Sequence, residues 1–161
     1  MVGRVFRLIA RFPIMYSRRP KESHLDTIDY EIEMLGFCAQ AVTHRQHSAP
    51  KDRYVYLEGF LLHYRNLIRF FSGEHHRADD LSTSNSAAWA ARNLTPDELT
   101  AIRVPAKILD TKYFGEISKY LHHCTLLRHD VDRGWDIEIM VREIEPILIA
   151  FQNARKASDT S

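Results

Sequence analysis

The most informative segment for the architecture is Tyr56-Leu57-Glu58-Gly59-Phe60-Leu61-Leu62-His63-Tyr64-Arg65-Asn66-Leu67-Ile68-Arg69-Phe70-Phe71. Its large apolar residues recur with the three-to-four-residue spacing of an α-helix, and no proline interrupts them. Apolar residues also fall on the reverse side of this helix, among them Val55 and Leu62. A helix that is apolar on two sides is usually central in its bundle, so a central helix is predicted from about Lys51 to Phe71, introduced by Pro50.

Similar periodic patterns predict the other helices, over residues 23–43, 108–127 and 135–154. Residues 73–106 hold a glycine, a Ser/Thr-rich stretch and Pro96, and they are predicted to form a long connection with short helical turns. No alternating strand pattern is longer than a few residues. The predicted fold is therefore all-α, a single up-and-down bundle of four or five helices.

Length and composition predict one domain. The chain has 161 residues, of which 45% are hydrophobic, enough for one core without disulfides or a structural metal. We expect a basic, flexible leader at residues 1–22, the bundle domain at residues 23–156 and a frayed tail at residues 157–161. Cys38 and Cys124 are read as buried thiols of a reducing compartment. Because no apolar run reaches the roughly 20 residues of a membrane-spanning helix, we expect a cytoplasmic protein without membrane contact.

The charge distribution argues against non-specific binding of nucleic acid. The first 21 residues carry six basic and no acidic side chains, so the other 140 residues carry 16 basic against 21 acidic side chains. A nucleic-acid-binding domain usually has the opposite balance.

The predicted central helix carries four polar candidates at the borders of its apolar face. Glu58 and Arg65 lie on one border, and His63 and Asn66 lie on the other. Buried charges need partners, so these groups either fix the packing of the helices or line a polar pocket. His63 and Arg65 are roughly 160° apart around the helix axis, which favours two separate contacts over one shared centre.

Further candidates lie outside that helix. His123, Thr125 and Arg128 stand near the end of the predicted 108–127 helix, where a cation also complements the helix dipole. Asp79 and Asp80 either cap a short helical turn or contact a ligand. The nine histidines and two cysteines follow no metal-ligand spacing, and no phosphate loop, dinucleotide fingerprint or Gly-x-Ser-x-Gly motif occurs, so neither a metal nor a cofactor is predicted.

These motifs resemble an uncharacterised family of small bacterial all-helical proteins. The resemblance rests on a His-x-Arg-Asn-Leu-Ile-x-Phe-Phe run, here His63–Phe71, and a His-x-Thr-x-x-Arg run, here His123–Arg128, with an acidic residue at Glu58 and an Asp-rich loop at Asp79-Asp80. It spans about residues 26–153. The resemblance marks these residues as important and assigns them no activity.

More distantly, the chain is similar to HEPN-type domains, many of which are metal-independent ribonucleases of toxin and defence systems. Their motif is an Arg, often followed by a polar residue, with a His four to six positions on, near a dimer interface. Here Arg65-Asn66 has no His at that spacing. A ribonuclease would have to combine His63 or His123 as general acid or base with Arg65 or Arg128 as stabiliser of the transition-state charge.

Three hypotheses for the function follow, and whether the protein is an enzyme stays open. The first is a helical bundle of unassigned activity with a polar pocket between the Lys51–Phe71 helix and the His123–Arg128 helix end. The second is a HEPN-like ribonuclease acting on RNA, with a homodimer as the expected assembly. The third is a protein- or small-ligand-binding module that uses the 73–106 loop.

Overall fold

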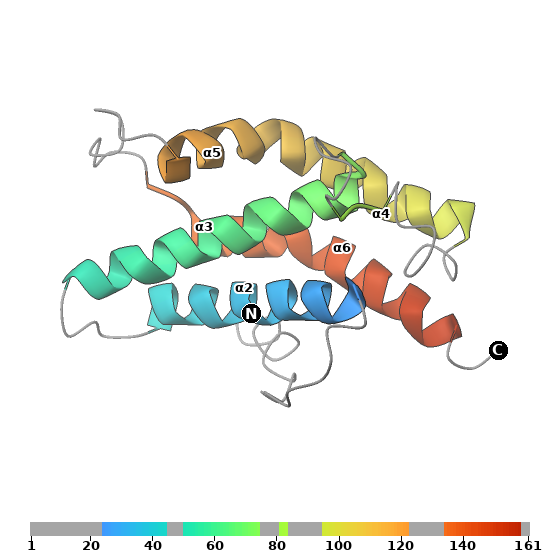
Figure 1. Cartoon of the computed structure of the whole chain (residues 1–161), viewed down its shortest axis with the longest axis horizontal. Helices are drawn as coiled ribbons and strands as arrows, with labels where there is room; N and C mark the ends of the chain where they lie inside the picture. The colour runs from blue at the N-terminus through green and yellow to red at the C-terminus, as the bar shows by residue number, and fades with distance from the viewer. Residues whose placement is uncertain (1–23, 45–49, 75–80, 84–94, 123–133, 159–161) are drawn as a thin grey trace.

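The structure is a computed structural model that describes residues 24–44, 50–74, 81–83, 95–122 and 134–158. Every regular element in these residues is a helix, and no strand occurs among them, so the all-α prediction is confirmed there (Figure 1). The elements are α2 (His24–His44), α3 (Pro50–Ser72), α4 (Pro96–Leu109), the π-helix η2 (Asp110–Phe114), α5 (Gly115–His122) and α6 (Ile137–Ser158).

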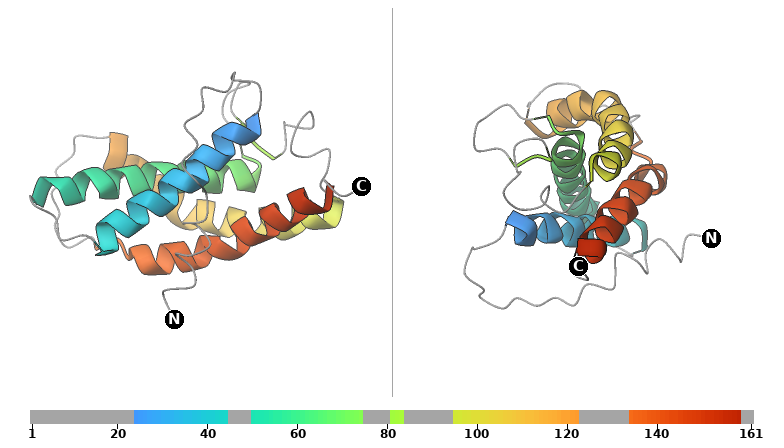
Figure 2. Two further views of the ribbon diagram at one scale, coloured as in Figure 1. Left: turned by 90° about the horizontal axis from the view of Figure 1, so that it is seen from below. Right: turned by 90° about the vertical axis from the view of Figure 1, so that its right-hand side faces the viewer.

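Helix α3 runs through the middle of the fold. The right-hand view of Figure 2 shows it with α2 and α6 below and α5 above. It contacts α2, α4, η2 and α5, which agrees with the central position that its two apolar sides predict. In Figure 1, α4, η2 and α5 follow one another as a single rod along one side of α3.

The predicted apolar faces meet in one core. Phe60, Tyr64 and Phe71 of α3 are fully buried, and the Phe71 ring packs edge-on against Phe151 of α6, with centroids 5.0 Å apart. The remaining faces contribute Ile28, Ile32, Leu35 and Ala39 of α2 and Met140, Val141, Ile144, Ile147 and Leu148 of α6. The helices thus bury the rows that their sequence periodicity singles out.

Gly59 lets α2 and α3 approach closely. A Cβ atom at this position would lie 2.9 Å from Cys38 Sγ, well inside van der Waals contact. Cys38 is buried and free, as predicted, and burial raises the pKa of its thiol to about 11. Cys124 lies outside the described residues.

The predicted connection over residues 73–106 is wrong from residue 96 onward, because α4 begins at Pro96. Thr95 caps this helix: its Oγ1 accepts a hydrogen bond from Glu98 N at 3.2 Å, and Glu98 Oε2 accepts one from Thr95 N at 2.8 Å. Pro96 occupies the first turn, where a missing N–H costs nothing. Pro105 lies inside α4 and does not end it.

The helices predicted over residues 23–43, 51–71 and 135–154 have ends within four residues of those of α2, α3 and α6. The single helix predicted over residues 108–127 is wrong in its start, because residues 108–122 belong to the end of α4, to η2 and to α5. Helix α6 continues to Ser158, so residues 157 and 158 of the expected frayed tail are helical. Helix α5 is described as far as His122, and residues 123–127 of the predicted 108–127 helix lie outside the described residues, as does the expected leader at residues 1–22.

In the described part of the chain, no helix combines the length and apolar character that crossing a membrane requires.

Candidate functional site

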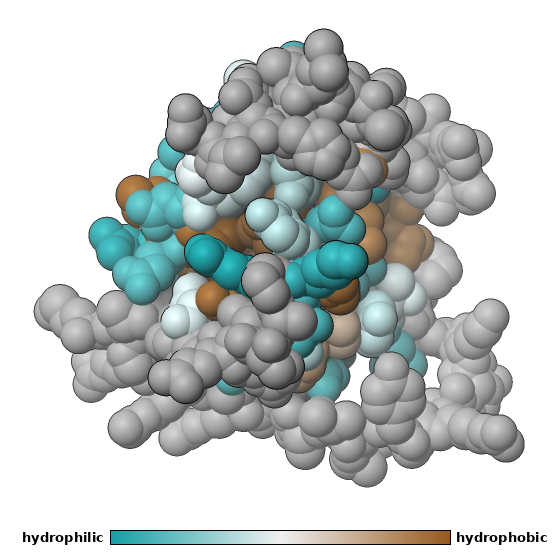
Figure 3. All heavy atoms as spheres, turned by 90° about the vertical axis from the view of Figure 1, so that its left-hand side faces the viewer, coloured by the Kyte–Doolittle hydropathy of each residue, from teal (hydrophilic) through white to brown (hydrophobic). Residues whose placement is uncertain are grey.

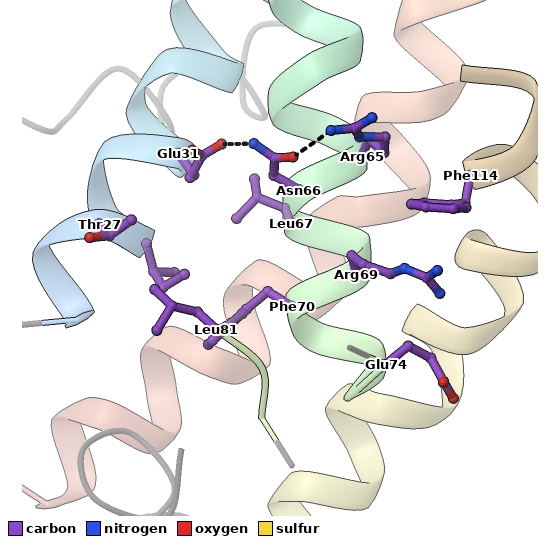
Figure 4. Close-up of a pocket in the computed structure, with 11 residues that line it drawn as sticks. Thr27, Glu31, Arg65, Asn66, Leu67, Arg69, Phe70, Glu74, Leu81 and Phe114 are labelled. Atoms are coloured by element: carbon purple, nitrogen blue, oxygen red, sulfur yellow. Dashed lines mark hydrogen bonds between the residues drawn. The ribbon is translucent and has the colours of Figure 1, made fainter. Parts of the chain in front are cut away.

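A pocket of about 330 Å³ lies beside α3, between α2 and the η2 segment. Figure 4 shows its side chains reaching in from α2, α3 and η2 and from residues after α3. One part of the lining is charged or polar, and the other is apolar. The lining residues are Thr27, Ile28, Glu31, Arg65, Asn66, Leu67, Arg69, Phe70, Glu74, Leu81 and Phe114.

Two arginines of α3 line this pocket. Arg65 and Arg69 are four residues apart, so they lie one above the other on the same side of the helix (Figure 4). Burial, and after it repulsion by the Arg69 guanidinium, lowers the pKa of Arg65, while the Glu31 carboxylate partly offsets both effects. Arginine keeps its proton at neutral pH, so the pocket contains two neighbouring positive charges.

The π-helix η2 holds Arg69 in place. Arg69 Nη1 donates a hydrogen bond to Asp110 Oδ2 at 3.0 Å, and its guanidinium carbon lies 3.8 Å from the centre of the Phe114 ring. Asp110 and Phe114 are the first and last residues of η2. Single-turn π-helical segments between α-helical turns are frequent at functional sites.

Asn66 links the arginines to an acidic group on α2. Its Nδ2 donates to Glu31 Oε2 at 3.2 Å, and its Oδ1 accepts from Arg65 Nη2 at 3.5 Å. Glu31 Oε2 also bonds His63 Nδ1 at 2.8 Å. Arg65, Asn66, Glu31 and His63 therefore form one chain of hydrogen bonds that crosses from α3 to α2 and back.

His63 belongs to this chain of hydrogen bonds but does not line the pocket. Its side chain is buried, with 6% of the residue exposed, and its ring packs edge-on against Tyr30 at 5.8 Å. It is absent from the pocket lining, whereas Arg65 is part of it. The two residues make separate contacts, as their angular separation on the helix predicts, and Asn66 with Glu31 connects them.

The remaining sequence candidates are not placed in this pocket. Glu58 is half-buried on α3 and does not line it. Asp79, Asp80, His123, Thr125 and Arg128 lie outside the described residues, and with them the predicted pocket at the His123–Arg128 helix end.

Sequence reasoning did not select Glu31, Arg69 or Phe114 as site residues. Glu31 directly precedes the buried Ile32, so a carboxylate at the edge of an apolar row was its only signal. Arg69 lies one turn beyond Arg65 on the same border of α3. Phe114 carried no signal, since its place beside Arg69 depends on the packing of η2 against α3.

A second polar cluster joins η2 to α6 beside the core. Glu143 accepts hydrogen bonds from Lys112 Nζ at 2.6 Å and from the Tyr113 hydroxyl at 2.7 Å. Burial alone would raise the pKa of Glu143, but these two hydrogen bonds outweigh it and the pKa is lowered. Tyr113 packs edge-on against the buried Tyr64, and burial raises the pKa of both phenols. This cluster fixes the η2 segment that holds Arg69.

A wider hollow of about 540 Å³ lies at the end of the molecule where α3 and α6 begin. Figure 3 views the molecule from this end and shows brown apolar surface among teal hydrophilic side chains. Its lining includes Arg53, Trp135 and Asp136. Asp136 Oδ1 accepts a hydrogen bond from Ile139 N at 3.0 Å, so its carboxylate caps the first turn of α6. The arginine-lined pocket is therefore the stronger candidate.

Across the described segments, no group of three or more His, Cys, Asp or Glu side chains is arranged to hold a metal ion. Comparison with known proteins gives no match: no family model, no curated protein and no solved structure matches this chain. The geometry of the pocket is thus the basis for a functional assignment.

Proposed function

We propose that this protein is a binding protein whose pocket beside α3 takes a small organic anion with an apolar part. The observation that carries the proposal is the pair Arg65 and Arg69, one helical turn apart and both lining the same pocket. Among the hypotheses from the sequence, this one is nearest to the small-ligand-binding module, because Glu74 and Leu81 of the 73–106 segment line the pocket as well.

The charge of the arginine pair favours an anion. Each guanidinium raises the free energy of the other, an effect that lowers the pKa of Arg65. A carboxylate or phosphate placed beside them would relieve this repulsion and accept two parallel N–H bonds from a planar guanidinium.

The rest of the lining favours an apolar group on the ligand. Ile28, Leu67, Phe70 and Leu81 provide a hydrophobic wall, and Phe114 adds an aromatic ring next to Arg69. The volume of about 330 Å³ is at the lower end of the range of ligand pockets, which fits one small molecule. Convergent polar groups beside an apolar wall are the usual composition of such a site.

The position of His63 favours binding over RNA cleavage by a mechanism that uses this histidine. A general acid or base must come within hydrogen-bond reach of the reacting atoms. His63 is buried, bonded to Glu31 and absent from the pocket lining, so it supports the acidic group and does not face a ligand.

Titration with three matched compounds tests the proposal. Isocaproate and isoamyl phosphate carry an anionic group on a branched alkyl chain, and isoamyl alcohol is a neutral relative. We expect the anions to bind with a Kd below roughly 1 mM and the alcohol to bind at least tenfold more weakly, measured by calorimetry and by proton–nitrogen correlation NMR. The preferred anion distinguishes a carboxylate ligand from a phosphate ligand.

A matched pair of variants locates the site. Arg65→Gln should weaken anion binding tenfold or more, because it removes one of the two charges that face the ligand. Arg142→Gln is the control, since Arg142 is exposed on α6 and does not line the pocket. Equal binding of the alcohol and the anions, or equal affinity of both variants for the anions, would refute the proposal.

A further inference from the structure

We infer that the ligand of this pocket is a zwitterion of the α-amino-acid type, with its carboxylate held by Arg65 and its ammonium held by Glu31. This inference rests on the proposed function, which requires only an organic anion. It adds a second charge of opposite sign to the ligand, and it assigns Glu31 as the residue that selects for that charge.

Glu31 has acceptor capacity left on the pocket side. Both hydrogen bonds that it receives within the described residues, from His63 Nδ1 at 2.8 Å and from Asn66 Nδ2 at 3.2 Å, reach the same oxygen, Oε2. An ionised carboxylate offers about four acceptor positions on two oxygens. Oε1 is therefore available to a donor that enters the pocket.

The surroundings of Glu31 favour a cationic donor. Its side chain lines the pocket and is only 16% exposed, so water solvates the carboxylate poorly. An ammonium group supplies both the hydrogen bond and the opposite charge, and such charge-assisted bonds are about twice as strong as neutral ones.

The spacing between Glu31 and Arg65 suits an α-amino acid. Asn66 already bridges the two with one amide group and two hydrogen bonds, of 3.2 Å to Glu31 and 3.5 Å to Arg65. The ammonium, Cα and carboxylate of an amino acid form a bridge of similar length, and its two hydrogen bonds would be shorter and charged. The Arg65 guanidinium would thus pair with the carboxylate of the ligand, and the Glu31 carboxylate would pair with its ammonium group.

Glu74 is the weaker partner for the ammonium. Its side chain is 51% exposed, and Lys107 Nζ lies 3.7 Å from its carboxylate. Solvent screens a charge at such a position. The ammonium is therefore assigned to Glu31, and the apolar wall of Ile28 and Phe70 is left for the side chain of the ligand.

Three compounds that share a branched alkyl chain and differ in their charged groups test the inference on the full chain. L-leucine carries both charges, isocaproate lacks the ammonium, and isoamylamine lacks the carboxylate. We expect leucine to bind at least tenfold more tightly than isocaproate and to bind far more tightly than isoamylamine, measured by calorimetry.

Glu31→Gln tests the assigned residue, because glutamine keeps the shape and an acceptor oxygen but loses the charge. The preference for leucine over isocaproate should fall to about twofold or less. Glu33→Gln is the control, because it removes the same charge from the same helix at a position that does not line the pocket. This variant should prefer leucine over isocaproate by the same factor as the wild type. The measured quantity is the ratio of the leucine and isocaproate affinities within each variant, so an equal loss of affinity for both compounds does not change it.

The outcomes separate this inference from the proposed function. If isocaproate binds as tightly as leucine, the zwitterion is refuted while the anion pocket stands. If neither leucine nor isocaproate binds at roughly 10 mM, the zwitterion is refuted, and the anion pocket is refuted with it only if isoamyl phosphate also fails to bind. If leucine is preferred equally by the wild type and by Glu31→Gln, the assignment of Glu31 is refuted. The comparison of wild-type ligands decides the central point even if Glu31→Gln fails to fold.

Discussion

Arg69 Nη1 lies 3.0 Å from Asp110 Oδ2 and thereby ties the end of helix α3 to the first residue of the π-helix η2. Both side chains are largely buried, with 20% and 13% of their surface exposed. The pair places a positive charge in the pocket wall and fixes the segment that carries Phe114. Stability and ligand binding are therefore linked at this contact.

Asp110→Asn should destabilise the fold by about 2 kcal/mol, because it removes one partner of a largely buried ion pair and leaves the Arg69 charge behind. Urea denaturation measures the change. Glu116→Gln serves as the comparison, since Glu116 lies in an exposed pair with Lys119 and its loss should cost less than about 0.5 kcal/mol. Equal costs for the two variants would contradict the structural role of the Arg69–Asp110 pair.

The same Asp110→Asn substitution should raise the affinity for isocaproate about threefold to tenfold. Asp110 is a negative charge bonded to one of the two arginines that are proposed to receive the anion, so its neutralisation removes competition and repulsion. Calorimetry at low salt gives the affinity, and the effect should shrink as salt is added. Weaker binding by the variant would show that Asp110 orients Arg69 for the ligand and does not compete with it.

Stability should fall in acid because of Glu143. Its pKa is lowered in the folded protein, with the Lys112 and Tyr113 hydrogen bonds outweighing burial, so this carboxylate stabilises the fold above its unfolded pKa of about 4.3. That contribution is lost as the pH falls through the lower, folded pKa. Urea midpoints at about pH 7 and about pH 3 should differ less in Glu143→Gln than in the wild type. Glu138→Gln, exposed on the same helix, should keep the wild-type difference.

Gly59 and Cys38 should show coupled effects on stability. Gly59→Ala alone should cost about 1 kcal/mol, because the new Cβ would lie 2.9 Å from Cys38 Sγ and the Cys38 side chain or one of the helices must shift. In a Cys38→Ala background the obstacle is gone, and Gly59→Ala should stabilise by about 0.5–1 kcal/mol through helix propensity. Denaturation of the four proteins of this double-mutant cycle gives the coupling. Additive effects would mean that the two helices are not in tight contact here.

Thr95→Ala should cost about 1 kcal/mol, because it removes the N-cap of α4. Thr100→Ala, exposed in the same helix, should leave the stability unchanged or slightly raised, since alanine is the better helix former. Thermal denaturation distinguishes the two. If both variants behave alike, the cap does not fix the start of α4.

The helices that the sequence predicted correctly are those with an uninterrupted apolar period. Helices α2, α3 and α6 each carry one buried row, such as Ile28, Ile32 and Leu35, and their ends lie within a few residues of the prediction. Helix α4 was missed because Pro96, with the glycine and the Ser/Thr-rich stretch before it, was assigned to a long connection. Thr95 and Glu98 form a capping box, so the sequence did contain the start signal, and Pro96 belongs to it.

The candidate site was predictable only in part. Arg65 and Asn66 were identified because polar residues at the border of a buried helix face need partners, and both line the pocket. Their partner Glu31 lies 35 positions before Asn66, and no local pattern connects the two. The zwitterion inference therefore depends on a contact between helices that the sequence does not reveal.

The helical class and the buried faces were predictable from the amino-acid sequence, because both follow from spacing within single helices, where each residue contacts residues three and four positions away. The contacts of α3 with α2 through Asn66 and Glu31, and with η2 through Arg69 and Asp110, were found only in the folded structure. Those contacts depend on how whole helices pack against one another. The charged pocket that carries the proposed function exists only once that packing has formed.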